Sequence, residues 1–150
     1  MKIGFEIHQQ LDTSKLFCSS PSILREEDEE FRIMRRLRPS QSELGAIDEA
    51  AMKEFLKGKN FIYKGYNDSI CLVELDEEPP RGPNSEAVDI SLTIASMLKA
   101  EIVDEIHFMR KVVIDGSNTG GFQRTAIIAF DGYLETKEGR IRIPTICLEE

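Results

Sequence analysis

The sequence lacks the features that mark membrane, secreted and disulfide-rich proteins. It has no run of about 18 apolar residues and no basic leader before an apolar stretch, so we expect a cytoplasmic protein with no membrane partner. Cysteines are few: Cys18, Cys71 and Cys147 form no pair at short spacing. They predict neither a disulfide framework nor a four-cysteine zinc site.

Basic residues are also in deficit. With 19 Lys plus Arg against 27 Asp plus Glu, the net charge of −8 disfavours loose binding to nucleic acid or to anionic membranes. Specific contacts through a local basic patch are still compatible with it. The chain has 150 residues, 41% of them hydrophobic and 31% charged, which is enough apolar material for one core. We therefore expect a single globular domain.

Hydrophobic patterning predicts more strands than helices. Strands are predicted at residues 2–8, 61–66, 70–75, 105–114, 125–134 and 140–148. Helices are predicted at residues 42–57 and after an N-cap at Asn84 or Ser85. We expect hairpins at 61–75 and at the last two strands, and an α+β fold with a mainly antiparallel sheet and packed helices.

Two charged blocks lie between the first strand and the first helix. Residues 25–30 are mostly acidic and residues 32–38 are mostly basic. Blocks of opposite sign are typical of a solvated face or a mobile loop, so no strand is predicted there.

The first predicted strand carries an acid and an imidazole two residues apart. Side chains alternate along a strand, so Glu6 and His8 share one face, opposite Ile3, Phe5 and Ile7. The two polar residues are roughly 6.6 Å apart along the backbone, close enough to reach one cation. The pair is either a metal or catalytic face, or the solvated face of an edge strand.

A loop of small, hydrogen-bonding residues follows the strand that contains Arg110 and Lys111. Glycines let a backbone approach phosphate closely, and hydroxyl, amide and basic side chains supply donors and charge. The loop spans residues 115–125 and includes Ser117, Asn118, Thr119, Gln123 and Arg124. It lacks the Walker A spacing. The loop is either a polyphosphate site or a plain hairpin turn.

Other polar and sulfur residues have simpler interpretations. The last strand should present Glu149 and Glu150 on opposite faces, although an acidic terminus is also common without function. We expect Cys18 to be a buried or adventitious thiol, Cys71 a core residue and His107 a structural histidine with a satisfied ring.

Four segments of the chain carry a family resemblance. They are GFEIHQQLDTSKLFC, CLVELDEEPPRGPNSEA, FMRKVVIDGSNTGGFQRTAIIAF and the final CLEE. These resemble the start of the archaeal E subunit of glutamyl-tRNA(Gln) amidotransferase and, more distantly, the related B subunit. The likeness spans nearly the whole chain, but members of the family are several times longer. It implies that residues 1–150 are the first part of a truncated, glutamine synthetase-like catalytic cradle domain.

The resemblance also implies a reaction and its participants. ATP phosphorylates the side-chain carboxylate of glutamate on misacylated tRNA(Gln), and ammonia from an asparaginase-like D subunit then displaces phosphate. Divalent cations must neutralise the reacting groups, which fits Mg²⁺ and leaves Mn²⁺ or Zn²⁺ open. The isolated fragment is expected to be inactive.

Residue roles follow from the same resemblance. Glu6, His8 and Glu150 are expected to be catalytic; Glu6, His8, Glu149 and Glu150 to bind metal; and Arg110, Lys111, Ser117, Asn118, Gln123 and Arg124 to line the nucleotide and phosphate region. Many members have Cys-x-Cys where this chain has Cys18 followed by Ser19 and Ser20, so a metal role is not expected there. The alternatives are a stand-alone metal-binding or protein-interaction module without catalysis, and a structural fragment with a solvated polar face.

Overall fold

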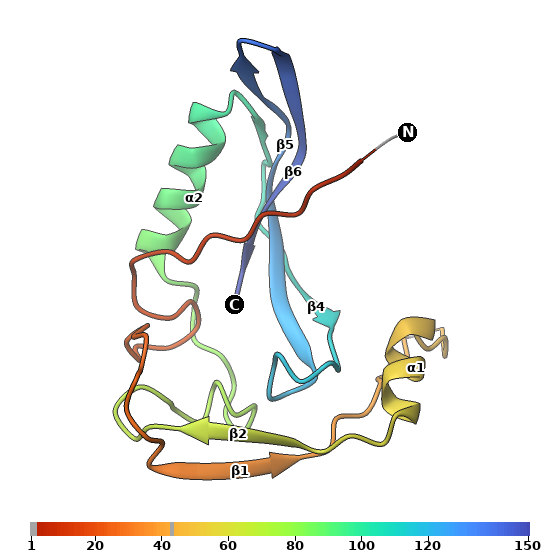
Figure 1. Cartoon of the computed structure of the whole chain (residues 1–150). Helices are drawn as coiled ribbons and strands as arrows, with labels where there is room; N and C mark the ends of the chain where they lie inside the picture. The colour runs from red at the N-terminus through yellow and green to blue at the C-terminus, as the bar shows by residue number, and fades with distance from the viewer. Residues whose placement is uncertain (1–2, 43) are drawn as a thin grey trace.

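The computed structural model describes residues 3–42 and 44–150 and has the predicted α+β architecture (Figure 1). In chain order the elements are β1 (Phe31–Arg35), α1 (Glu49–Leu56), β2 (Phe61–Gly65), α2 (Ser85–Met97), β3 (Glu101–Ile102), β4 (Phe108–Val112), β5 (Phe122–Thr136) and β6 (Gly139–Glu149). The strands pair antiparallel in two sheets. In these two ranges no helix is long and apolar enough to cross a membrane.

A long hairpin forms the centre of the larger sheet. β5 pairs with β6 on one side and with β3 and β4 on the other. At the turn, the Thr136 hydroxyl donates to the Gly139 carbonyl at 2.6 Å, and Gly139 has a φ of 120°, a conformation that glycine adopts at little cost. The predicted hairpin at the end of the chain is confirmed. It brings the last residues of β6 beside the first residues of β5.

The second helix begins where the sequence predicts it. The Asn84 side chain accepts hydrogen bonds from the Glu86 and Ala87 amides at 2.9 and 3.3 Å, which makes Asn84 the N-cap. α2 runs alongside the β5–β6 hairpin (Figure 1). The main core lies between the helix, the sheet and two loops, and its buried members are Leu16, Phe17, Cys18, Val73, Ala87, Ala95, Ile128, Ala129 and Leu148.

The smaller sheet differs from the prediction. We predicted that residues 61–66 pair with residues 70–75, but β2 pairs with β1 from Phe31 to Arg35. Half-buried and exposed residues alternate along β1, a pattern that the interleaved basic side chains conceal in the sequence. The basic block is therefore partly a strand and not a mobile loop, although Arg32, Arg36 and Arg38 are exposed, as expected of a solvated face. Residues 72–76 form a turn, and the amide of Cys71, just before it, donates to the Glu74 carboxylate at 2.9 Å.

The first helix is shorter than predicted. It begins after Asp48, whose carboxylate accepts the Ala51 amide at 2.7 Å and so caps the helix. The predicted helix began at residue 42, but the Ser42 carbonyl accepts the Gly45 amide in a turn outside α1, and Glu43 lies outside the described residues. A second, smaller core forms beside the helix from Leu37, Ala51, Ile114, Phe55 and Phe61.

The predicted first strand is not formed. Lys2 lies outside the described residues, and residues 3–8 belong to no strand. The apolar face predicted for this segment is open to solvent, with Phe5 and Ile7 each 88% exposed. An apolar alternation forms a strand only where a neighbouring strand offers hydrogen bonds, and the described chain offers none here. The segment passes across the larger sheet (Figure 1).

Candidate functional site

The two ends of the chain meet at the candidate cation site. His8 Nε2 lies 3.2 Å from Glu6 Oε1, and His8 Nδ1 lies 3.7 Å from Glu149 Oε2. Glu6 and His8 therefore lie on the same side of their segment, although the strand that predicted this is absent. The Glu6 and His8 side chains are 74% and 67% exposed, whereas Glu149 is only 18% exposed.

Glu149 holds the least solvated oxygen of this group. Its Oε1 lies 3.2 Å from Lys111 Nζ across the sheet, which accounts for one oxygen. Its Oε2 is buried and has no hydrogen-bond partner among the described residues. A buried, unpaired carboxylate oxygen is costly unless a cation or a donor reaches it. The neighbour of this oxygen is His8 Nδ1, which at 3.7 Å lies beyond hydrogen-bond distance, so this oxygen is the part of Glu149 open to a cation.

The donor set suits a divalent cation. Carboxylate oxygens are the ligands that Mg²⁺ prefers, and an imidazole nitrogen also suits Mn²⁺ or Zn²⁺. His8 presents different ring nitrogens to Glu6 and Glu149, so the three donor atoms do not surround one point. Binding requires the exposed Glu6 and His8 side chains to turn toward Glu149, which their solvent exposure allows.

Glu150 points to a different partner, as strand alternation predicts. Its two carboxylate oxygens each lie 2.8 Å from Arg124 Nη1, and its backbone amide donates to the Arg124 carbonyl at 3.0 Å. The contacts of Glu149 and Glu150 thus belong to opposite sides of β6. The role of Glu150 as a metal ligand stays a prediction.

Arg124 is held by aromatic rings as well as by acids. Its guanidinium carbon lies 5.5 Å from the Phe17 ring centroid and 5.1 Å from that of Phe122. The guanidinium carbon of Arg110 lies 4.9 Å from the centroid of the same Phe122 ring. Arg124 Nη1 contacts Glu150 and Nη2 lies 3.8 Å from Asp76 Oδ1, so the aromatic rings and the two acids together orient this guanidinium. Sequence reasoning missed Phe17 and Phe122, because their only signal is aromatic character in apolar stretches.

The basic residues predicted to bind phosphate lie on two opposite faces of the larger sheet. Arg110 and Lys111 are neighbours on β4, so their side chains leave opposite faces. Lys111 joins Glu149, while Arg110 joins Phe122 and faces Arg124 across the β4–β5 pair. The sequence had grouped these side chains as one basic cluster, and the structure instead separates them into two.

Residues of the loop at 115–121 form hydrogen bonds within the protein. Ser117 donates its amide and its hydroxyl to Asp115 Oδ1 at 2.8 and 2.6 Å, and these bonds lower the pKa of the Asp115 carboxyl. The Asn118 carbonyl accepts from the Tyr63 hydroxyl at 3.0 Å, and the Thr119 hydroxyl donates to the Glu74 carbonyl. An anionic Asp115 beside Ser117 opposes phosphate there. The loop's visible contacts dock it onto β2 and the turn at Glu74.

One large, open cavity nevertheless borders most of the predicted site residues. Its volume is about 1710 Å³, above the roughly 300–1000 Å³ typical of small-molecule sites. Eight of the ten predicted side chains line it: Glu6, His8, Ser117, Asn118, Gln123, Arg124, Glu149 and Glu150. Arg110 and Lys111 are not in the lining.

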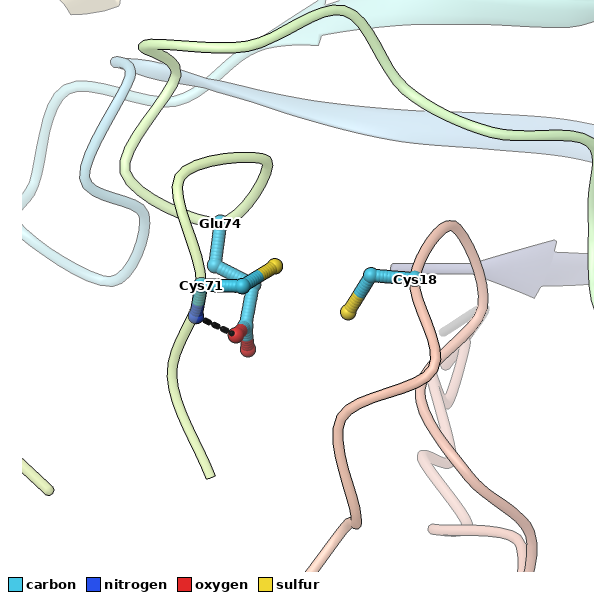
Figure 2. Close-up of side chains that lie close together, drawn as sticks. All are labelled: Cys18, Cys71 and Glu74. Atoms are coloured by element: carbon cyan, nitrogen blue, oxygen red, sulfur yellow. Dashed lines mark hydrogen bonds between the residues drawn. The ribbon is translucent and has the colours of Figure 1, made fainter. Parts of the chain in front are cut away.

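The remaining predicted residues lie elsewhere. Figure 2 shows Cys18 and Cys71 turned toward a common space beside Glu74, with the ligand atoms of the three side chains within 4.8 Å of one another. The Lys15 ammonium forms an ion pair with Glu74 and would repel a cation, so this cluster does not suit a metal. Cys18 lies in the main core, as predicted, and Cys71 packs against it. His107 pairs with Glu105 at the surface, at 2.9 Å.

Comparison with known proteins decides the family. The whole chain, residues 1–150, matches the family model of the GatB/GatE catalytic domain. The chain belongs to this family. Among curated GatB/GatE relatives, it is 56% identical to the E subunit of glutamyl-tRNA(Gln) amidotransferase from Methanocaldococcus jannaschii and 59% identical to those from Thermococcus gammatolerans and Pyrococcus furiosus. Each match covers 100% of this chain but only 24% of the relative. The chain thus spans about a quarter of the length of these GatB/GatE proteins.

Proposed function

We propose that this chain forms part of the catalytic domain in the E subunit of a glutamyl-tRNA(Gln) amidotransferase. In the proposed reaction, ATP transfers its γ-phosphoryl group to the side-chain carboxylate of glutamate on tRNA(Gln). Ammonia then attacks the activated carbonyl carbon, and phosphate leaves to give glutaminyl-tRNA(Gln). An asparaginase-like D subunit supplies the ammonia, and the reaction takes place in the cytoplasm.

The observation that carries this proposal is the buried Glu149 oxygen beside Glu6 and His8, which has no hydrogen-bond partner among the described residues. It supports a cation site within a chain that matches amidotransferase relatives over its whole length. Glu6, His8 and Glu149 would hold Mg²⁺, or Mn²⁺ in its place. When bound, the cation supplies charge neutralisation between two groups that repel each other, the carboxylate and the polyphosphate.

The basic residues have separate tasks in this proposal. Arg124, fixed by Glu150 and by two aromatic rings, orients a phosphate oxygen at the wall of the cavity. Lys111 pairs with Glu149 across the sheet and holds its carboxylate in place. Gln123 donates to the Glu150 backbone carbonyl at 3.0 Å and so positions the end of β6. Glu150 acts through Arg124 in this scheme.

The test places this sequence in a full-length protein. Residues 1–150 replace the matching segment of the M. jannaschii E subunit, and the chimera is supplied with glutamyl-tRNA(Gln), ATP, Mg²⁺ and ammonium chloride. We expect ATP-dependent formation of glutaminyl-tRNA(Gln). Glu149→Gln should lower the rate by at least about 100-fold, since cation contacts are worth several kcal/mol in phosphoryl transfer. The binding of tRNA should stay within a few fold.

The matched control is Glu135→Gln, an acid on β5 that pairs with the exposed Arg140. It should retain turnover within about threefold, as expected for an exposed ion pair. A folded chimera that binds divalent cations but forms no product would favour the alternative, a metal-binding module without catalysis. Equal turnover of Glu149→Gln and the unmodified chimera would exclude Glu149 from the site.

A further inference from the structure

Two of the three cysteines, 53 positions apart in the sequence, present their thiols to each other. Cys18 lies in the loop before β1, and Cys71 lies in the turn after β2. Their sulfur atoms are within 4.8 Å (Figure 2). A disulfide needs about 2.05 Å between the sulfur atoms, so both thiols would have to rotate toward each other to bond. Both cysteines are free in the structure.

The segments that carry the two thiols are already fixed beside each other. Lys15 Nζ forms an ion pair with Glu74 and donates to the Ser69 carbonyl at 2.6 Å. The Arg81 amide donates to the Phe17 carbonyl at 3.0 Å. Linking Cys18 to Cys71 would therefore join two segments that other contacts already hold side by side.

The two thiols differ in access and in acidity. Cys18 is 9% exposed, and burial raises its pKa. Cys71 is more exposed; burial acts to raise its pKa as well, but hydrogen bonds involving Ser20, the Glu74 and Val73 backbone and Cys18 outweigh burial and lower it. A more accessible thiol that ionises more easily is suited to attack, and a buried neighbour is suited to resolve the product.

We propose that Cys18 and Cys71 form a reversible redox pair that closes to a disulfide by exchange with a small-molecule disulfide of the glutathione class. The Cys71 thiolate attacks one sulfur of the small disulfide, a mixed disulfide forms, and one thiolate leaves. Cys18, as its thiolate, then attacks Cys71 Sγ and expels the second thiolate. The protein loses two electrons, the small disulfide gains them, and the two cysteine protons end on the two released thiols.

A disulfide between Cys18 and Cys71 would form next to residues of the candidate site. Phe17 adjoins Cys18 and stacks on Arg124, and the Glu74 carbonyl accepts the Thr119 hydroxyl. The disulfide would covalently join the loop that contains Phe17, beside Arg124, to the turn at Glu74, which contacts the 115–121 loop. The inference does not depend on the proposed function, because it concerns only the chemistry of the two thiols.

Peptide mapping of the full 150-residue chain tests the pair. The chain is incubated with glutathione disulfide, remaining thiols are alkylated, and trypsin is added without reduction. Cleavage after lysine and arginine places Cys18 in peptide 16–25, Cys71 in peptide 65–81 and Cys147 in peptide 143–150. We expect peptides 16–25 and 65–81 to be joined, about 2 Da below the sum of their masses because two thiol hydrogens are lost. Dithiothreitol should separate them.

Variants distinguish the steps. Cys147→Ser should form the same cross-link as the unmodified chain. Cys18→Ser should retain a glutathione adduct on Cys71, because no thiol is available to resolve it. A stable glutathione adduct on Cys71 in the unmodified chain, a cross-link through peptide 143–150, or complete alkylation of both Cys18 and Cys71 after oxidation would each overturn the proposal. The decisive result comes from the unmodified chain, so poor folding of a variant does not affect it.

Discussion

The two ends of the chain contribute to the candidate cation site from different structural settings. Glu149 is part of the β5–β6 ladder, is 18% exposed and has Lys111 as a partner. Glu6 and His8 lie on a segment that belongs to no strand, and both are mostly exposed. The C-terminal end is preorganised by packing, whereas the N-terminal end meets it through the contact of His8 with Glu149. The packed end should therefore dominate stability, and the exposed end should matter only for the site.

The largest expected effect is in the core beneath the packed end. Ile128 on β5 is fully buried, so Ile128→Ala should lower the free energy of unfolding by about 2–5 kcal/mol. Ile128→Val, which removes one methyl group, should cost about 0.5–1.5 kcal/mol. Urea denaturation of both variants measures this. Two variants as stable as the unmodified chain would show that β5 does not support the fold.

A smaller effect is expected where Arg124 joins the end of β6 to the loop at Phe17. Arg124→Lys keeps the charge but loses the planar fork and the stacking, so it should cost about 1–3 kcal/mol of unfolding free energy. The matched control is Arg142→Lys. Arg142 forms an exposed ion pair with Asp131, so this substitution should lower the free energy of unfolding by less than about 1 kcal/mol. If the two substitutions cost the same in urea denaturation, Arg124 is not a structural anchor.

Stability measured as a function of pH tests the smaller sheet, β1–β2, which is separate from both ends of the chain. A backbone hydrogen bond, Arg32 and Lys64 lower the pKa of Glu29 from 4.5 to about 2. A lowered folded pKa stabilises the protein above the unfolded value, and this contribution is lost as the pH falls from 4.5 toward about 2. Glu29→Gln should thus lose less stability than the unmodified chain between pH 7 and about pH 3. An identical pH dependence in urea denaturation would exclude the interaction.

The smallest effect is expected at the exposed end. Phe5 is 88% exposed, so Phe5→Ala should change the free energy of unfolding by less than about 0.5 kcal/mol, despite the size of the side chain. Thermal unfolding followed by circular dichroism measures the shift. A loss comparable to that of Ile128→Ala would mean that the N-terminal segment packs more closely than the structure shows.

The success of sequence reasoning differs between these regions for physical reasons. The last hairpin and α2 were predictable because a Gly139 turn and an Asn84 cap are local signals. The opposite orientations of Glu149 and Glu150 followed from strand alternation. The β1–β2 pair was missed because arginines mask its alternation, and the N-terminal strand was wrong because hydrogen bonding to a partner strand cannot be read from an apolar pattern.

Contacts between segments far apart in the chain could not be predicted from the sequence. Nothing in the spacing of Cys18 and Cys71 indicates that they meet, and the basic residues of β4 and β5 were grouped without regard to the two faces of the sheet. The convergence of His8 with Glu149 was expected from the family resemblance alone. The unpartnered oxygen of Glu149 is a property that only the packed structure shows.

The most direct test of the cation site is a Mn²⁺ titration of the full 150-residue chain, followed by the electron paramagnetic resonance signal of the free ion. We expect Glu149→Gln to weaken Mn²⁺ binding by at least about tenfold, the loss expected when a cation site is disturbed. Glu150→Gln, whose carboxylate contacts Arg124, should stay within about threefold. Equal Mn²⁺ affinity for Glu149→Gln and the unmodified chain would contradict the central claim that the ends of the chain form one cation site.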